Sequence, residues 1–207
     1  MKKRSIALLV ALSLCVGSAV GGTLAWLKAS TSEVVNTFTI GDINIDLKEH
    51  DYDPVSGALT DTEVPSNDDY KYVPGATLPK DPFVTVKANS EACGLFVEVT
   101  EANNSQGTVT DVIEWSVDTS AGQWILVPGQ TNVWYREVAA TTEDTEFTVL
   151  ADNKVTVSSD VTKDMVTNLN DNKPTLTFKA YAVQSANLKD GSNNAVTTAE
   201  AAWALAK

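Results

Sequence analysis

The sequence predicts an all-β protein: a single antiparallel β-sandwich with a short C-terminal helix, preceded by a cleaved signal peptide. Three observations predict it. Apolar residues alternate with polar ones over many short segments, which is the pattern of half-buried strands. Polar turn signals, such as those at 103–104, 128–129 and 170–172, separate these segments. Helical periodicity is nearly absent, and short strands joined by polar turns are typical of a sandwich.

The composition argues against several classes of function. The chain has 207 residues, a formal net charge of −12, one His and two Cys. A nucleic-acid binder needs clustered Lys and Arg to meet the phosphates, so an acidic chain is a poor candidate. One His cannot supply a His-rich metal site. The length allows one domain or a small pair of domains.

Residues 1–25 have the three parts of a secretory signal peptide. Three basic residues near the start precede an apolar run over 6–20 and a stretch of small residues. Thr23 and Ala25 fit a small-x-small cleavage site, so we expect cleavage between Ala25 and Trp26. The alternative is an uncleaved anchor, because the uncharged stretch is long enough to cross a bilayer. Its glycines lower the hydrophobicity and favour cleavage.

Cleavage changes the charge and the cysteine content of the remaining single domain, residues 26–207. Removing the leader takes away three of the 15 basic groups and none of the 27 acidic ones, which leaves a net charge of −15. Only Cys93 remains, so an intramolecular disulfide is impossible. A secreted domain of this size can be stabilised by its core alone, because disulfides are chiefly needed below ~80 residues. We expect membrane contact only through the uncleaved precursor.

The expected strands follow the leader in order. Alternating apolar residues mark the first strands over 37–40 and 43–47. Residues 48–80 form an acidic, Pro-containing connection, which indicates a long surface excursion with room for a short edge hairpin. The later candidate strands hold Val84 and Val86; Leu95, Val97 and Val99; Ile113, Trp115 and Val117; Trp124 and Leu126; Val133 and Tyr135; Phe147 and Val149; Val155 and Val157; and Leu176, Phe178, Ala180 and Ala182.

Helical signals are confined to two places. Thr197 and Glu200 have the spacing of a capping box ahead of an apolar run over 201–206, so we expect a short C-terminal helix there. Trp203 in this helix has to dock on its own domain or on a neighbouring molecule. A second, weaker helical turn is expected near 160–169.

Neither the His nor the remaining Cys lies in a catalytic motif. His50 lies in the acidic segment 49–53, without a second His, an H-E-x-x-H motif or a nucleophile elbow. A catalytic His needs an orienting partner and a pocket, so we interpret His50 as part of a solvated loop. Cys93 has the parity of the inward residues of its strand, which favours a buried, inert thiol. We therefore expect no enzymatic activity.

Acidic loops and tryptophans offer two further kinds of site. Residues 46–69 and 190–193 are rich in the oxygen ligands that calcium prefers, but neither stretch has EF-hand spacing. We interpret both as solvated loops and expect no cofactor, with calcium as the alternative. Trp115, Trp124 and Trp134 could line a carbohydrate platform, although their strand-like setting favours packing for at least two of them.

The leader and three strand segments carry a family resemblance. The matching segments are 21–26, 36–47, 74–78, 80–82, 84–87, 96–99 and 178–184. They cover both ends of the domain and leave 103–175 matched only loosely. In these segments the chain resembles the TasA/camelysin family of bacterial matrix proteins, which are exported with the ER-type signal peptidase SipW.

The resemblance implies a jelly-roll or immunoglobulin-like sandwich, secretion from a Gram-positive bacterium, and assembly into extracellular fibres of a biofilm matrix or cell surface. The implied partners are other copies of this chain, a SipW-type signal peptidase during export, and other matrix or cell-wall components. In that family the mature N-terminal segment of one subunit completes the sheet of the next. Here residues 26–38 lack Pro and Gly and could add as a strand to an open edge. The expected donor residues are Trp26, Leu27, Val34, Val35 and Phe38.

Two alternative functions remain open at the level of the sequence. The family includes casein-cleaving metalloproteases, and a camelysin-type peptidase would act with a bound metal. The zinc motif that such an activity would need is missing. A monomeric adhesin or carbohydrate-binding module would use the tryptophans, above all Trp124 and Trp134.

Overall fold

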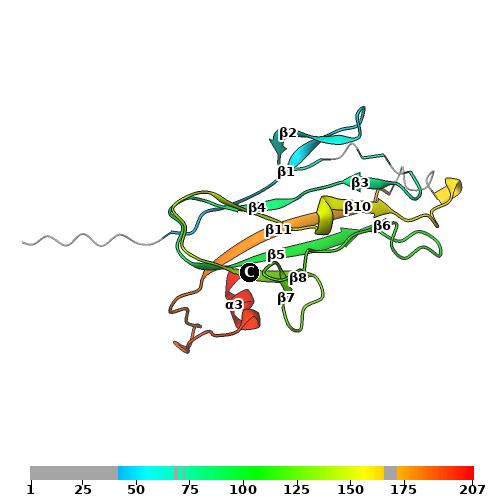
Figure 1. Cartoon of the computed structure of the whole chain (residues 1–207). Coiled ribbons are helices and arrows are strands. Elements are labelled where there is room, and N and C mark those ends of the chain that lie inside the picture. The colour runs from blue at the N-terminus through cyan, green and yellow to red at the C-terminus, as the bar shows by residue number, and fades with distance from the viewer. Residues whose placement is uncertain (1–41, 68–69, 72, 166–171) are drawn as a thin grey trace, which may run out of the picture. The chain divides into compact units, whose positions relative to one another are not determined.

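The fold is all-β, with antiparallel pairing throughout the described chain and a short C-terminal helix (Figure 1). The computed structural model describes residues 42–67, 70–71, 73–165 and 172–207, which lie within the compact unit Gly41–Lys207. The strands are β1 (Ile45–Asp53), β2 (Ala58–Val64), β3 (Thr77–Pro79), β4 (Phe83–Val86), β5 (Cys93–Ala102), β6 (Ile113–Glu114), β7 (Ile125–Leu126), β8 (Val133–Val138), β9 (Thr145–Thr148), β10 (Lys154–Val157) and β11 (Thr175–Gln184). The prediction of an all-β class is confirmed.

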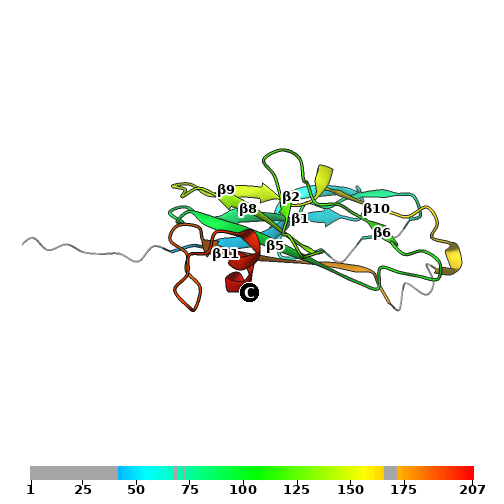
Figure 2. The same ribbon diagram turned by 90° about the horizontal axis from the view of Figure 1, so that it is seen from below.

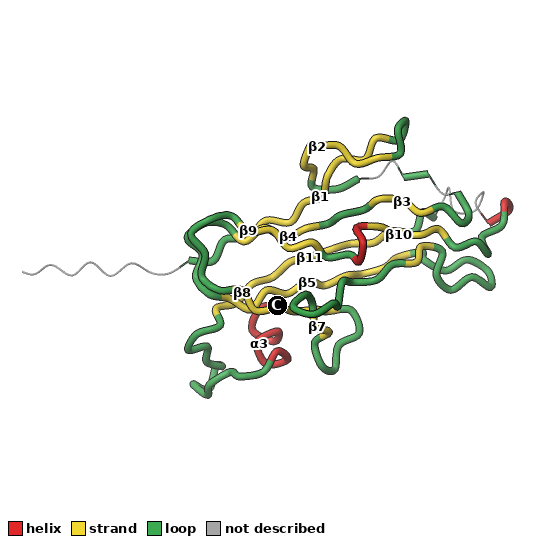
Figure 3. The backbone as a smooth tube through the Cα atoms, viewed as in Figure 1, coloured by secondary structure: helices red, strands yellow, loops and turns green. Residues whose placement is uncertain are grey.

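The strands form three sheets with the orders β2-β1-β4-β9, β3-β10-β6 and β11-β5-β8-β7. β3 leads into β4, and β9 leads into β10 through the 3-10 turn Ala151–Asn153, so the first two sheets continue one another (Figures 1 and 3). The arrangement is that of two layers, with the third sheet opposite the other two. One layer of this sandwich-like arrangement is therefore built from strands that are interrupted along their length, β3 with β4 and β9 with β10.

The main core lies between the layers. Val84 and Val86 of β4 pack with Cys93, Leu95 and Val97 of β5, and all five are fully buried. One face of β5 meets this core, Phe96 on the other face is also buried, and the pairing of β5 with β11 and β8 fixes the register on both sides. The buried, inward-facing thiol expected for Cys93 is confirmed.

A second apolar cluster lies under the C-terminal helix α3 (Ala199–Ala206), which rests on the sheet of β11, β5 and β8 (Figure 2). Trp203 is 5% exposed and packs edge-on against Tyr181, with ring centroids 5.0 Å apart. The helix begins one residue later than the capping-box spacing indicated. Thr198, and not Thr197, caps it by accepting a hydrogen bond from the amide of Ala201 at 3.3 Å.

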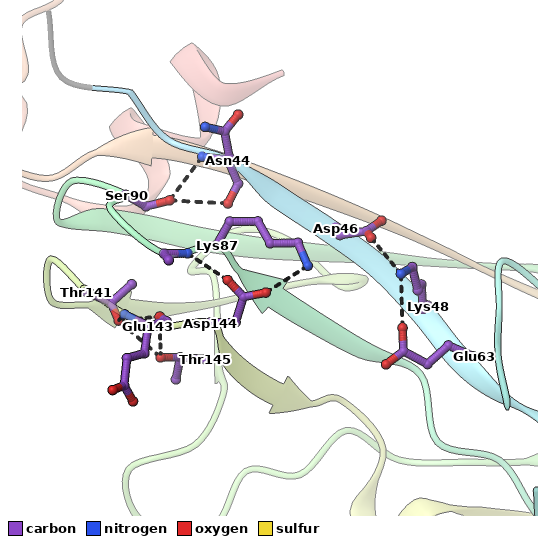
Figure 4. Close-up of polar contacts among 11 residues, drawn as sticks. Asn44, Asp46, Lys48, Glu63, Lys87, Ser90, Thr141, Glu143, Asp144 and Thr145 are labelled. Carbon is purple, nitrogen blue, oxygen red and sulfur yellow. Dashed lines mark hydrogen bonds and ion pairs between the residues drawn. The ribbon is translucent and has the colours of Figure 1, made fainter. Parts of the chain in front are cut away.

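The connection at 48–80 contains more regular structure than its composition indicated. β1 continues to Asp53 and forms a hairpin with β2, and its register shifts between His50 and Tyr52. Lys48 holds the hairpin on its exposed face, with its Nζ 2.9 Å from Glu63 and 3.1 Å from Asp46 (Figure 4). The edge hairpin is therefore present, and it is continuous with the strand that begins at Ile45.

Several expectations fall outside the described residues. These are the leader at 1–25, its cleavage site at Ala25 and Trp26, and the strand expected at 37–40. Of the helical turn expected near 160–169, the structure describes helical residues at 163–165. In the part of the chain that is described, no helix has the length and apolar character needed to cross a membrane.

Candidate functional site

The long strand β11 leaves one of its two edges unpaired. It spans ten residues, pairs along its whole length with β5, and is the outermost strand of its sheet in the described chain. The amide of Ser185 donates to the carbonyl of Ala92 at 3.0 Å. In an antiparallel pair, hydrogen-bonded and non-hydrogen-bonded residue pairs alternate. The residues of β11 whose N–H and C=O groups point away from β5 are therefore Leu176, Phe178, Ala180, Ala182 and Gln184.

The side chains of most of these residues face the interior. Leu176, Phe178, Ala180 and Ala182 pack against the apolar clusters, whereas Thr177 is exposed between two of them. The alternation expected for this strand from its sequence is thus present. A strand that paired with the open edge would lie beside apolar side chains that are already half-buried.

Within the described residues, the facing strand β1 also has backbone groups without a strand partner. The amide of Lys87 donates to the carbonyl of Asn44 at 2.8 Å, which makes these two a hydrogen-bonded pair. By the same alternation, the backbone groups of Ile45 and Leu47 point away from β4. Pairing with β2 begins only at Glu49. Two open edges therefore border the same side of the structure.

Two adjacent cavities border β11 and share Asn67, Lys80 and Leu176 in their walls. The first measures about 170 Å³ and lies toward Thr175, at the start of β11. The second measures about 200 Å³ and reaches Leu47 of β1. Because the cavities share walls, we treat them as one edge groove, and we keep that name below.

A buried ion pair forms the polar part of the edge groove. Lys80 Nζ lies 2.6 Å from Glu49 Oε2, and the two side chains are 11% and 6% exposed. The other carboxylate oxygen of Glu49 accepts the backbone amide of Asn67 at 2.6 Å. Lys80 Nζ also lies 5.2 Å from the ring centroid of Tyr70 and 5.8 Å from that of Phe178. This pairing satisfies charges that would otherwise be costly to bury.

His50 lies on β1, so its interpretation as a residue of a solvated loop is wrong. Its Nδ1 is 2.6 Å from Asp81 Oδ2, and its backbone amide donates to Asp81 Oδ1 at 3.1 Å. The ring also tilts against Phe83, with centroids 5.3 Å apart. The hydrogen bond to Asp81 raises the pKa of His50 above its ordinary value near 6.5, and partial burial opposes this. Glu63 and Glu146 raise it further.

Asn67 holds the irregular part of β1 in place. Its side-chain oxygen accepts the amide of Tyr52 at 2.8 Å, and its side-chain nitrogen donates to the carbonyl of His50 at 2.8 Å. The amide side chain thus replaces a strand partner where the β1–β2 register shifts. Tyr70 stacks on Tyr52 with ring centroids 4.5 Å apart. Burial, followed by the nearby charge of Glu49, raises the pKa of Tyr70.

The three tryptophans considered for a carbohydrate platform pack against other parts of the fold. Trp124 is 1% exposed, and its Nε1 donates to the carbonyl of Thr148 at 2.7 Å. Trp115 and Trp134 meet edge to face, with centroids 5.9 Å apart, and both pack against the main core. Packing therefore accounts for all three, as their strand-like setting favoured.

The acidic loops hold no cluster of metal ligands in the described ranges, since no group of three or more His, Cys, Asp or Glu side chains converges there. At the second loop, Asp190 accepts the backbone amides of Ser192 and Asn194 at 2.9 and 2.8 Å. These bonds and the one to the Asn194 side chain lower the pKa of Asp190. The loop carboxylate is thus used to close its own turn.

The structure describes the groove but not the expected donor residues. Trp26, Leu27, Val34, Val35 and Phe38 lie outside the described residues. The edge groove was not found from the sequence, because Glu49 and Lys80 are 31 residues apart and look like ordinary surface charges. The parity of β11 was the available signal, since an edge strand with one apolar face is where a partner can add.

Comparison with known proteins found no match, since no protein-family model, no curated protein and no solved structure matches the chain. The resemblance to the TasA/camelysin family therefore stays a prediction that depends on the segments named above. The function has to be argued from the open edge of β11 and the edge groove.

Proposed function

We propose that this protein is a secreted structural protein of the TasA/camelysin type that assembles into extracellular fibres by strand donation. Its fold would be a jelly-roll or immunoglobulin-like sandwich. The observation that carries the proposal is the unpaired edge of β11, ten residues long, beside the edge groove.

Apart from the exposed Lys179, the open edge lacks the features that usually prevent association. Natural sheets protect their edges with prolines, bulges, very short strands or charges that point inward. β11 contains no proline, and its register with β5 is continuous from Thr175 to Gln184. Its inward-facing residues Leu176, Phe178, Ala180 and Ala182 carry no charge. An edge of this kind favours the addition of another strand.

The donor would be the segment 26–38 of another copy. It contains no Pro or Gly, so every residue can contribute a backbone donor and an acceptor. Backbone hydrogen bonds to the edge of β11 would supply affinity, and the side chains that enter the groove would supply register. Each copy then donates at one place and accepts at another. Such head-to-tail addition does not close on itself, so the product is a filament.

Export would require removal of residues 1–25 by a SipW-type signal peptidase, which frees Trp26 as the new N-terminus. The product would lie in the matrix or at the cell surface. The cleavage step matters for the mechanism, because an uncleaved leader would hold the donor segment at the membrane.

The first test compares the exported chain with a variant that lacks 26–35, using electron microscopy of both at equal concentration. We expect filaments from the first and monomers from the second. Equal filaments from both would overturn strand donation, although assembly by another route would remain.

The second test targets the acceptor edge. Ala180→Pro removes an N–H that points toward the open edge and leaves the hydrogen bonds to β5 in place. Ala180→Val is the matched control, because it also enlarges the side chain but keeps the N–H. We expect at least a tenfold lower filament yield from the Pro variant, with an unchanged far-UV CD spectrum. Normal filaments from a folded Pro variant would show that this edge accepts no strand.

A further inference from the structure

We propose that the cavity at the start of β11 is an anchor pocket for the aromatic ring of Phe38 from a second copy of the chain. This inference rests on the proposed strand donation and adds to it the side chain, the pocket and the direction of the added strand.

The cavity has the chemistry and the size for a phenyl ring. Leu78, Ile113, Val155 and Leu176 supply apolar walls, Tyr70 supplies an aromatic one, and Asn67, Lys80, Lys173 and Thr175 supply a polar rim. Its volume is about 170 Å³. An apolar cavity of roughly 150 Å³ is large enough to bind benzene, so the volume of this partly polar cavity is sufficient for a phenyl ring. Burying that ring would remove about 150–250 Å² of apolar surface from water.

The cavity lies where a strand on the open edge would pass. Leu176 lines it and is also the first residue of β11 whose backbone groups point toward that edge. A residue paired near Leu176 would therefore direct its side chain into the cavity, because inward-facing side chains alternate along an added strand. The lining therefore predicts the register of the added strand, with Phe38 of the donor beside Leu176 of the acceptor.

The chain's own Phe38 cannot reach this cavity. The amide of Glu91 donates to the carbonyl of Asp42 at 3.0 Å, and the neighbouring Ala92 bonds Ser185. The described chain therefore begins beside the C-terminal end of β11, as Figure 1 also shows. The cavity lies at the other end, ten residues away, which is about 30 Å along a strand.

Phe38 precedes Asp42 by four positions, and an extended chain spans at most ~14 Å over four residues. Even with the length of the Phe side chain added, a ring from the same chain would fall short of the cavity. The ring has to come from a second copy whose own start lies near Thr175 of the acceptor. That geometry also sets the direction of the donor strand relative to β11. The donor would enter at the Thr175 end with Phe38 and extend toward Gln184 with its earlier residues, antiparallel to β11.

The test replaces Phe38 with the photo-crosslinking residue p-azidophenylalanine, which keeps the aromatic ring. The matched control carries the same residue at Val55, which is 93% exposed on the β1–β2 turn. After irradiation of the assembled exported chain, we expect covalent dimers from the first variant and none from the second. Mass spectrometry should place the crosslink on a residue that lines the cavity in the other copy, either a nucleophilic one (Lys80, Lys173 or Tyr70) or an apolar one (Leu78, Ile113, Val155 or Leu176).

The outcomes separate this inference from the proposed function. Filaments with a crosslink elsewhere on the partner, or with a crosslink inside one chain, would overturn the anchor pocket and leave strand donation standing. If the exported chain formed no filaments and no crosslinked dimers, the proposed function would be overturned and, with it, the inference. Dimers linked through the cavity walls would support both.

Discussion

Glu49 and Lys80 form a buried ion pair in the wall of the edge groove, with Lys80 Nζ 2.6 Å from Glu49 Oε2. The adjacent residues form a second pair, since His50 on β1 bonds Asp81 next to Lys80. Two consecutive residues of β1 are therefore joined to two consecutive residues between β3 and β4. These contacts hold β1 in place along the side of the groove that faces β11.

Lys80→Met should destabilise the fold strongly, because it leaves the buried carboxylate of Glu49 without its counter-charge. Breaking one partner of a buried pair costs about 3–5 kcal/mol. Chemical denaturation monitored by tryptophan fluorescence would measure the loss in the free energy of unfolding.

The double variant Glu49→Leu/Lys80→Met is the control for this prediction. It removes both charges, so most of the loss should be recovered, because apolar replacement of a buried pair is often neutral or stabilising. The amide of Asn67 loses its acceptor in this variant, which leaves a residual cost of about 1–3 kcal/mol. Equal losses in the single and the double variant would contradict the role of the pair.

His50 should stabilise the protein more at mildly acidic than at alkaline pH. The bond to Asp81 raises the folded pKa of His50 above the unfolded value near 6.5. A raised pKa contributes stability that is fully present below the unfolded value and is lost as the pH rises through the folded value. The side chain is 34% exposed, so solvent screening keeps the effect below ~1 kcal/mol.

The measurement compares the free energy of unfolding of the wild type and of His50→Gln at pH 5.5 and pH 8.5. The difference between the two proteins should be larger at pH 5.5. The chain has one His, so proton NMR of its imidazole ring gives the pKa without assignment. A ring that titrates below 6.5, or a difference that grows toward pH 8.5, would contradict the prediction.

The sequence predicted the parts of the fold that depend on local alternation. Cys93, Leu95 and Val97 share the face of β5 that meets the main core, and Phe96 points to the cluster under α3 on the other face, so period two predicts which side chains lie together. The strand expected to hold Trp124 and Leu126 is present only over Ile125–Leu126. Trp124 is buried ahead of β7, whereas Leu126 is 43% exposed on this two-residue edge strand.

The groove could not be predicted because it depends on contacts between residues distant in sequence. His50 looked solvated because its partner Asp81 follows 31 residues later. Asn67 has no sequence signature, although its side chain bonds both sides of the irregular segment of β1. Local periodicity carries no information about such pairings, whereas it does specify which face of β11 is apolar.

Trp203→Ala should release the C-terminal helix without unfolding the sandwich. Trp203 is the buried residue of α3 and contacts Tyr181 and Phe96, with ring centroids 5.0 and 5.6 Å away. Truncating a buried Trp lowers the free energy of unfolding by about 3–5 kcal/mol. The exposed N-cap hydrogen bond of Thr198 contributes only about 1 kcal/mol, so it cannot hold the helix in place alone. Limited proteolysis should then remove the C-terminal segment faster than in Leu205→Ala, since Leu205 is 42% exposed. Equal cleavage of both variants would show that another contact holds the helix.

Cys93 should resist thiol reagents for as long as the sandwich is folded. The residue is fully buried, and burial raises the pKa of its thiol, so both access and the thiolate fraction are low. We expect slow modification by Ellman's reagent in native buffer and stoichiometric modification in denaturant. Under native conditions the rate should follow the opening of β5, and it should therefore rise in Lys80→Met by the factor by which that variant increases the unfolded population. Rapid labelling of the folded wild type would contradict the burial of this side chain. A rate that is unchanged in Lys80→Met despite lower stability would show instead that the thiol is reached by a local motion that leaves the Glu49–Lys80 pair intact.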